Sequence, residues 1–230
     1  MRQEVVEGGA RVVVFGPPSD RGVVLVPEVR GIDANIEVYA GKLVDEGYVV
    51  AVPDPWFAAG AVPDLSSGQA VAAAVASVDD SAMLRLVVRA RDALGPVTGR
   101  AVVGFCMGGL YARMAATVVP GFSAAVEFYG RVVYPTLTPA KPVQPLDLLP
   151  GRACALLCHF GTEDPVAPPR HVDLLESRLA TQPSPARVYR YRGCGHAFAN
   201  PGQPTWNAEA AALAWARSLR WLDEHLPEAG

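Results

Sequence analysis

Short apolar runs alternate with amphipathic segments along most of the chain. Continuous apolar runs are typical of strands covered on both faces, and they predict strands at 22–27, 48–52, 100–103, 124–129, 153–160 and 186–191. Apolar residues three and four positions apart predict helices at 36–46, 79–94, 107–118, 168–181 and 206–225. This alternation predicts an α/β fold with a mostly parallel central sheet and helices on both faces, preceded by a hairpin around Gly8-Gly9.

Two stretches between these elements predict connections without regular structure. Residues 53–68 are rich in Pro, Gly and Ala and predict a loop, and the sequence does not decide whether this loop closes as a lid. Residues 136–151 are rich in proline and predict an irregular surface connection. Because neither stretch resembles a linker and no internal repeat is present, we expect residues 1–230 to form a single domain.

Composition and charge narrow the classes of function. Half of the 230 residues are hydrophobic, which suits one large core, and the net charge of −3 without a basic run argues against nucleic-acid binding. No apolar run approaches the roughly 20 residues that a membrane-spanning helix needs. The N-terminus lacks a signal-peptide pattern and the four cysteines have no disulfide-framework spacing, so we expect a cytoplasmic protein with free thiols.

One cysteine lies in a glycine-rich corner between a predicted strand and a predicted helix. Residues 104–108, Gly-Phe-Cys-Met-Gly, fit the pattern G-x-nucleophile-x-G, in which small residues let strand and helix pass closely. The turn exposes Cys106 at a helix N-terminus, whose dipole favours a thiolate, and directs the Met107 amide toward the same space. The alternatives are a buried core cysteine and, less favoured because the spacing G-x-G-x-x-G is absent, a dinucleotide-binding loop.

Two later strand ends supply partners for this nucleophile. Asp164 follows the strand 153–160, and His196 follows the strand 186–191. The chain order nucleophile, acid, histidine, each just beyond the carboxyl end of a strand, is the order of α/β-hydrolase triads. In this interpretation His196 accepts the proton of Cys106 and Asp164 orients the imidazole. Taken singly, Asp164 also suits a turn or helix cap, and His196 also suits an ordinary loop.

Together these motifs resemble the dienelactone hydrolase family, a cysteine-nucleophile branch of the α/β-hydrolases. The resemblance covers almost the whole chain and rests on VPEVRGID (26–33), YVVAVPDPW (48–56), GFCMGG (104–109), EFYG (127–130), HFGTEDPVAP (159–168) and GHAFAN (195–200). It implies the α/β-hydrolase fold and the cleavage of an ester or lactone through an acyl-thioester. It implies no metal and no organic cofactor, and the expected partner is a small-molecule ester or lactone met by a monomer or homodimer.

The resemblance also implies roles for residues that are unremarkable in the sequence alone. In the family a glutamate after the early strand interacts with the resting cysteine and helps to form the thiolate, and Glu28 occupies that position here. The backbone amides of Val29 and Met107 are then expected to form the oxyanion hole.

The sequence departs from the family at the residues that bind a substrate carboxylate. Well-known members use two arginines, but Asn200 occupies one position and residues 53–77 contain neither arginine nor lysine. An amide cannot replace a bidentate guanidinium, so we expect a substrate that is neutral or bulkier compared with dienelactone. The expected substrate-binding residues flank the catalytic corners: Trp56, Phe57, Tyr129, Phe198 and Asn200.

Three alternatives to ester or lactone hydrolysis stay open. The same site suits acyl transfer, lactonisation or a rearrangement in a biosynthetic pathway. The scaffold also suits a non-enzymatic binding protein, although the full set of Glu28, Cys106, Asp164 and His196 argues against it. A metal site at Cys154 and Cys158 is the weakest alternative, because neighbouring leucines indicate a core strand.

Overall fold

A computed structural model describes residues 1–226, and residues 227–230 of the predicted single domain lie outside the described residues. The strands are β1 (Arg2–Glu7), β2 (Ala10–Phe15), β3 (Arg21–Val26), β4 (Val49–Pro53), β5 (Gly99–Phe105), β6 (Ala124–Phe128), β7 (Ala155–Gly161) and β8 (Ala186–Tyr191). The helices are α1 (Ala34–Asp45), α2 (Gly68–Ser77), α3 (Asp80–Ala93), α4 (Met107–Val118), α5 (Pro145–Leu148), α6 (Pro169–Leu179) and α7 (Ala208–His225), with short 3-10 turns η1 (Phe57–Ala59) and η2 (Leu149–Gly151).

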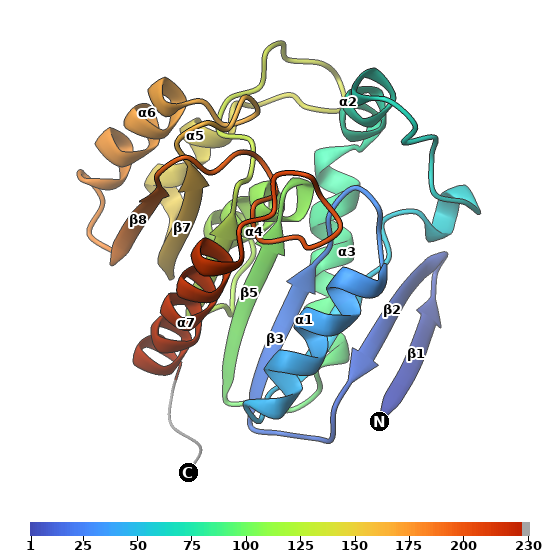
Figure 1. Cartoon of the computed structure of the whole chain (residues 1–230). Helices are drawn as coiled ribbons and strands as arrows, with labels where there is room; N and C mark the ends of the chain where they lie inside the picture. The colour runs from blue at the N-terminus through green and yellow to red at the C-terminus, as the bar shows by residue number, and fades with distance from the viewer. Residues whose placement is uncertain (227–230) are drawn as a thin grey trace.

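The strands form a single eight-stranded sheet in the order β1-β2-β4-β3-β5-β6-β7-β8 (Figure 1). The hairpin β1–β2 adds to β4 in the antiparallel sense, and every pair from β4–β3 to β7–β8 is parallel. The predicted mostly parallel sheet is therefore confirmed. The parallel strands bring their carboxyl ends, and the loops that follow them, to one edge of the sheet.

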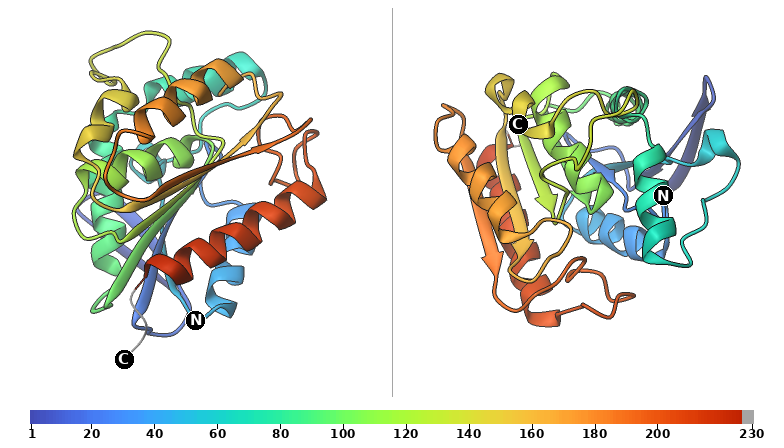
Figure 2. Two further views of the ribbon diagram at one scale, coloured as in Figure 1. Left: turned by 90° about the vertical axis from the view of Figure 1, so that its left-hand side faces the viewer. Right: turned by 90° about the horizontal axis from the view of Figure 1, so that it is seen from above.

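Helices cover both faces of the sheet, as the alternating pattern predicts. Helices α1 and α7 pack on one face, and α3, α4 and α6 pack on the other (Figures 1 and 2). In β3, Val23 and Leu25 face the first layer while Val24 and Val26 face the second, and all four are fully buried. Each such side chain contributes about 1.5–3 kcal/mol by leaving water, so both layers hold the strand in place.

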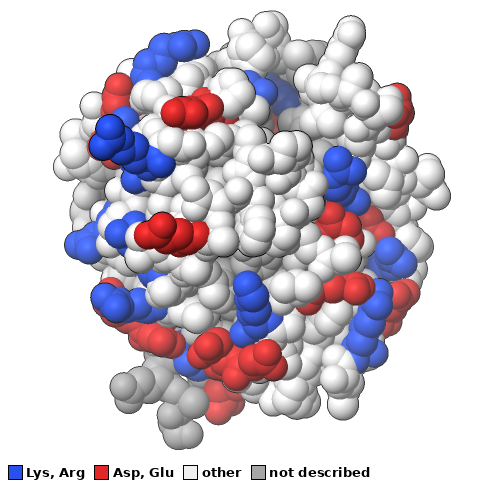
Figure 3. All heavy atoms as spheres, viewed as in Figure 1, with Lys and Arg blue, Asp and Glu red and all other residues white. Residues whose placement is uncertain are grey.

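Helix α2 was not expected from the sequence. The middle of α2, residues 70–76, consists entirely of alanine and valine, so its apolar positions show no helical spacing. The local signal is Ser67, whose side chain accepts a hydrogen bond from the Ala70 amide at 3.1 Å, followed by a run of alanines, the strongest helix formers. The upper right of Figure 3, where α2 lies, is mostly free of charged side chains.

Two further predictions differ from the structure. The segment 136–151 is not purely an irregular surface connection, because it contains α5 and η2 and buries Lys141 and Leu149. The last helix begins at Ala208 rather than at Trp206, because the Asn207 side chain caps it by accepting from the Ala210 amide at 3.0 Å. Within residues 1–226, no helix combines the length and apolar character needed to cross a membrane.

Candidate active site

Cys106 occupies a tight turn between β5 and α4, with φ 53° and ψ −114°. The glycines two residues before and two residues after Cys106 are required because there is no room for a side chain at either position. A Cβ atom on Gly104 would overlap the Gly108 carbonyl group, and a Cβ atom on Gly108 would overlap the Val26 carbonyl group. The close passage that the sequence pattern predicts is therefore present, and it presents the Cys106 side chain at the carboxyl edge of the sheet.

Left-handed backbone at non-glycine residues is concentrated around this turn. Among residues 1–226, only Cys106, Tyr129 and Ala197 combine a side chain with positive φ, at 53°, 42° and 61°. Cys106 and Ala197 line one cavity, and the Tyr129 ring packs edge-on against the ring of His196 at 5.3 Å. Such conformations cost about 1–3 kcal/mol each and are typical of functional sites, where the surrounding fold enforces them.

A continuous chain of hydrogen bonds links Cys106, His196 and Asp164. The sulfur of Cys106 lies 3.1 Å from Nε2 of His196, and Nδ1 of His196 lies 2.9 Å from Oδ2 of Asp164. The other carboxylate oxygen of Asp164 accepts from the amides of Val166 at 2.7 Å and Ala167 at 3.1 Å. The structure thus brings together the three side chains that the sequence places after three different strands.

The charges of the three hydrogen-bonded residues Cys106, His196 and Asp164 reinforce one another. Burial alone lowers the pKa of His196, but the Cys106 sulfur and the Asp164 carboxylate outweigh burial and raise the pKa to about 10. These contacts therefore favour the protonated imidazole beside the sulfur. A neighbouring imidazolium favours the thiolate, which is the nucleophilic form of cysteine.

Glu28 lies in the same cavity but is held by other partners. Its Oε2 accepts from the Asn200 amide group at 2.8 Å, and its Oε1 accepts from the Tyr129 hydroxyl at 3.2 Å. Burial raises the pKa of Glu28, whereas the Asn200 hydrogen bond and the nearby His196 charge act in the opposite direction. Within residues 1–226 no hydrogen bond joins Glu28 to Cys106. The Cys106 sulfur contacts Nε2 of His196 instead, which differs from the contact between glutamate and resting cysteine that the resemblance implies.

Two residues of the cavity lining have backbone amides without a hydrogen-bond acceptor. Val29 and Met107 both line the cavity, and neither N–H donates a hydrogen bond within the described part of the chain. Buried amides are nearly always paired, so this pair is available for a developing oxyanion. The next peptide group is anchored, because Nε1 of Trp56 donates to the Val29 carbonyl at 2.7 Å.

The cavity at the sulfur has a volume of about 200 Å³. Its apolar wall comes from Val71, Ala72 and Val75 of α2 and from Leu110 of α4. Typical pockets for drug-sized ligands measure about 300–1,000 Å³, so the part of a substrate inside this one is small. Two arginines, Arg30 and Arg131, also line it.

None of the five residues expected to bind substrate lines this cavity. Trp56 holds the Val29 peptide, and Phe57 lies partly exposed beneath the Arg11 guanidinium, 5.7 Å from it. Tyr129 and Phe198 are fully buried in the core layer that contains α1 and α7, and Asn200 donates to Glu28. Trp56, Tyr129 and Asn200 thus each hold a neighbouring group of the site.

The lining residues missed from the sequence include those of α2 together with Arg30 and Arg131. The N-cap at Ser67 could have indicated the helix. Both arginines follow motifs that the sequence does single out, Arg30 within Glu28-Val-Arg-Gly31 and Arg131 directly after EFYG, 127–130.

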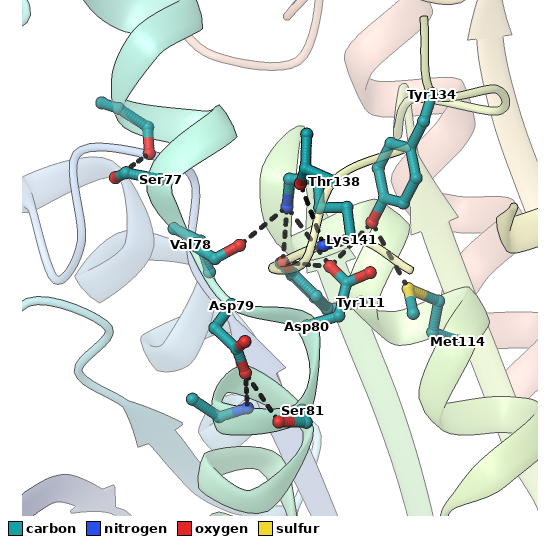
Figure 4. A network of polar contacts seen from close by, with 12 residues as sticks. Ser77, Val78, Asp79, Asp80, Ser81, Tyr111, Met114, Tyr134, Thr138 and Lys141 are labelled. Atoms are coloured by element: carbon teal, nitrogen blue, oxygen red, sulfur yellow. Dashed lines mark hydrogen bonds and ion pairs between the residues drawn. The ribbon is translucent and has the colours of Figure 1, made fainter. Parts of the chain in front are cut away.

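A closed polar cluster lies beneath α2 and joins it to the rest of the fold (Figure 4). Oδ1 of Asp80 accepts from the hydroxyls of Tyr111 at 2.9 Å and Tyr134 at 2.8 Å, and it lies 3.3 Å from Nζ of Lys141. Lys141 also donates to the Val78 carbonyl at 2.9 Å. Since Val78 ends α2 and Asp80 begins α3, the cluster fixes the junction that carries the apolar wall of the cavity.

Comparison with known proteins gives consistent matches. The model of the dienelactone hydrolase family matches residues 10–226. A Bradyrhizobium protein assigned as a 2-oxo-3-(5-oxofuran-2-ylidene)propanoate lactonase is 31% identical, over 95% of this chain and 91% of its own length. A Yersinia pestis protein assigned as a carboxymethylenebutenolidase is 29% identical, over 88% of this chain and 78% of its own length.

Solved structures show the same fold. The crystal structure of a Klebsiella pneumoniae protein assigned as a dienelactone hydrolase superimposes with a TM-score of 0.85, at 22% identity, over 98% of this chain and 99% of that one. A dienelactone hydrolase-like promiscuous phosphotriesterase from metagenomic libraries superimposes with a TM-score of 0.75, at 22% identity, over 99% and 98% of the two chains. The α/β-hydrolase fold expected from the sequence is confirmed.

Proposed function

The chain belongs to the dienelactone hydrolase family and is an ester or lactone hydrolase, and we propose that it cleaves its substrate through Cys106, His196 and Asp164. The observation that carries the proposal is the hydrogen-bond chain from the Cys106 sulfur through both ring nitrogens of His196 to Asp164, at 3.1 and 2.9 Å. Nucleophile and base within hydrogen-bond reach, with the base oriented by a third group, is the arrangement that nucleophilic catalysis needs.

In the proposed reaction the Cys106 thiolate attacks the carbonyl carbon and forms a tetrahedral oxyanion. The N–H groups of Val29 and Met107 donate to this oxygen. When the oxyanion collapses, the bond to the leaving oxygen breaks, and the His196 imidazolium protonates that oxygen. The acyl group is then held as a thioester on Cys106.

A water molecule completes the reaction. Neutral His196 takes a proton from the water as its oxygen attacks the thioester, and collapse of the second oxyanion expels the Cys106 thiolate beside the restored imidazolium. Asp164 keeps the imidazole oriented in both half-reactions.

The cavity favours a small substrate. The sequence predicts one that is neutral or bulkier compared with dienelactone, because the two arginines of well-known members are absent from their usual positions. With a cavity of about 200 Å³, the part of the substrate at the sulfur is small, and Arg30 and Arg131 also line that space. The relatives' assigned activities, on a 5-oxofuran-2-ylidene propanoate and a carboxymethylenebutenolide, favour a small lactone.

The test is hydrolysis of a series of 4-nitrophenyl esters with intact-mass detection of an acyl-enzyme. Cys106→Ala is compared with the wild type and with Cys154→Ala, which removes a buried thiol remote from the cavity. We expect turnover and a transient adduct in the wild type and Cys154→Ala, and neither in Cys106→Ala. A stable adduct without turnover supports the acyl-transfer alternative instead. Equal turnover in all three proteins contradicts the proposal.

A further inference from the structure

Helix α2 presents one of its sides to the catalytic cavity. Gly68, Val71, Ala72 and Val75 all line the cavity, whereas Ala74, between them in the sequence, is buried in the core. Positions 68, 71, 72 and 75 share one side of an α-helix, because residues three and four apart lie above one another. No residue of α2 is charged, so the side chains on this side offer a ligand apolar contact only.

The first half of this side is built from residues smaller than the fold requires. The φ of Gly68 is not positive, and a Cβ atom added to Gly68 would meet nothing within 4 Å. Ala72, one turn further along, is exposed although it belongs to the lining. Larger side chains at these two positions would therefore extend into open space at the cavity rather than into the core.

Helix α2 is held at both ends. At its start, the Ser67 side chain accepts a hydrogen bond from the Ala70 amide at 3.1 Å. Just beyond its end, Nζ of Lys141 donates to the Val78 carbonyl at 2.9 Å. The wall of the cavity is thus preorganised, and a preorganised wall can select a ligand by its size without paying the cost of ordering on binding.

The position of α2 relative to the sheet indicates which part of a substrate meets it. Ala197 and Phe198, which directly follow His196, belong to the core layer of α1 and α7. Val71 and Val75 pack in the opposite layer, with α3 and α4. In the proposed reaction the leaving oxygen faces His196, because the imidazolium protonates it. The acyl chain is the other substituent of the reacting carbon, so it extends away from His196, toward α2.

We propose that Gly68, Val71, Ala72 and Val75 form the subsite for the acyl group, and that the substrate carries a short uncharged aliphatic chain there. The inference rests on the proposed function, because it takes the reacting carbonyl to lie at the Cys106 sulfur. Each methylene group that leaves water against this wall favours binding. The cavity of about 200 Å³ ends that gain once the chain fills it, so α2 sets the length of chain that the enzyme accepts.

The test compares two esters that share a leaving group. 4-Nitrophenyl acetate and 4-nitrophenyl hexanoate differ by four methylene groups in the acyl chain, and the quantity measured is the hexanoate-to-acetate ratio of their kcat/KM values. The variants are Ala72→Leu, which extends into the cavity, and Val75→Ala, which enlarges it. Ala73→Leu is the matched control, because Ala73 is exposed on the same helix and does not belong to the lining.

The ratio is expected to fall about 10-fold in Ala72→Leu and to rise about 10-fold in Val75→Ala, since one methylene group in a hydrophobic pocket changes specificity by about 10-fold or more. Ala73→Leu should keep the wild-type ratio. Ala72→Leu is the decisive variant, because the exposed position accepts a larger side chain and leucine is a strong helix former. An unchanged ratio in Ala72→Leu overturns the proposal, as does an equal fall in Ala73→Leu.

A reaction that needs no hydrolysis separates this proposal from the proposed function. Alkyl methanethiosulfonates transfer a thioalkyl group to a thiolate: a disulfide forms at Cys106 and methanesulfinate leaves. Cys106 is partly exposed, whereas the other three cysteines are buried. The pentyl-to-methyl ratio of the modification rates, followed by intact mass and peptide mapping, should fall in Ala72→Leu and not in Ala73→Leu.

The two readouts together assign any failure. If hydrolysis depends on Cys106 but neither ratio changes in Ala72→Leu, the acyl subsite is wrong and the hydrolase stands. If no ester is cleaved but the pentyl-to-methyl ratio falls in Ala72→Leu alone, the subsite stands and the hydrolase proposal fails.

Discussion

Two buried polar clusters in this protein are built from similar parts but differ in where they end. Each centres on a buried aspartate, Asp164 in the catalytic cluster and Asp80 in the cluster beneath α2. The donors of Asp80 are Tyr111, Tyr134 and Lys141, all from the surrounding elements, so that cluster closes on itself (Figure 4). The chain from Asp164 instead ends at a sulfur atom that lines a cavity.

The difference also appears in the charges. Burial raises the pKa of Tyr111 and Tyr134 in the closed cluster, so both hydroxyls stay protonated and act only as donors. In the catalytic cluster the sulfur and Asp164 raise the pKa of His196 to about 10, which keeps a mobile proton beside a nucleophile. A closed cluster holds segments together, whereas an open one keeps a reactive group ready. Variants in the two clusters should therefore separate activity from stability.

The largest separation is expected for Cys106→Ala. Removing the nucleophile should lower kcat/KM by at least about 10,000-fold, as for other members of a catalytic triad. Thermal or urea unfolding should change by only about 1 kcal/mol, because the sulfur is partly exposed at the cavity and closes no structural network. A large loss of stability in this variant would mean that the catalytic cluster also holds the fold together.

Asp164→Asn should lower kcat/KM by about 100- to 10,000-fold with the nucleophile intact. The carboxylate is one of the groups that raise the pKa of His196, so its removal lowers that pKa. The imidazolium then loses its proton at a lower pH, and the alkaline limb of the kcat/KM profile moves from near pH 10 toward neutral pH. The measurement is the pH profile on a 4-nitrophenyl ester, and an unmoved limb contradicts the role of Asp164.

Lys141→Met, unlike the variants of the catalytic cluster, should lower the stability of the fold more than the activity. It leaves Asp80 buried without its cationic partner, and breaking a buried pair in this way typically costs about 3–5 kcal/mol. Urea unfolding measures the loss. The double variant Lys141→Met with Asp80→Asn should regain part of it, because the unpaired charge is gone. A change below about 1 kcal/mol in Lys141→Met would show that the closed cluster does not hold the α2–α3 junction.

The smallest effect is expected for Asn200→Ala, which removes one donor from the Glu28 carboxylate and should cost about 1–3 kcal/mol. Burial already raises the pKa of Glu28, and losing this donor raises it further. A folded state with a raised carboxyl pKa binds more protons than the unfolded state, so its stability falls as the pH rises. The deficit relative to the wild type should be larger at pH 8 than at pH 5 in urea unfolding, and a pH-independent deficit argues that Asn200 does not act on Glu28.

Much of this protein is determined by the sequence itself. The apolar runs predict the sheet, and the positions of Cys106, Asp164 and His196 after three strands predict their meeting, because parallel strands place their carboxyl ends at one edge. The glycines around Cys106 predict the tight turn, since only they allow the close passage found there. These inferences depend on local patterns and on the geometry that every parallel sheet shares.

Only the tertiary structure decided which side chains face the cavity. Trp56, Tyr129 and Asn200 flank the catalytic corners in the sequence, yet each one turns to hold a neighbouring group. The apolar wall comes from α2 and from Leu110 of α4, and Arg30 and Arg131 also line the cavity. The direction of these side chains follows from how segments far apart in the chain pack against each other, and no local pattern records that packing.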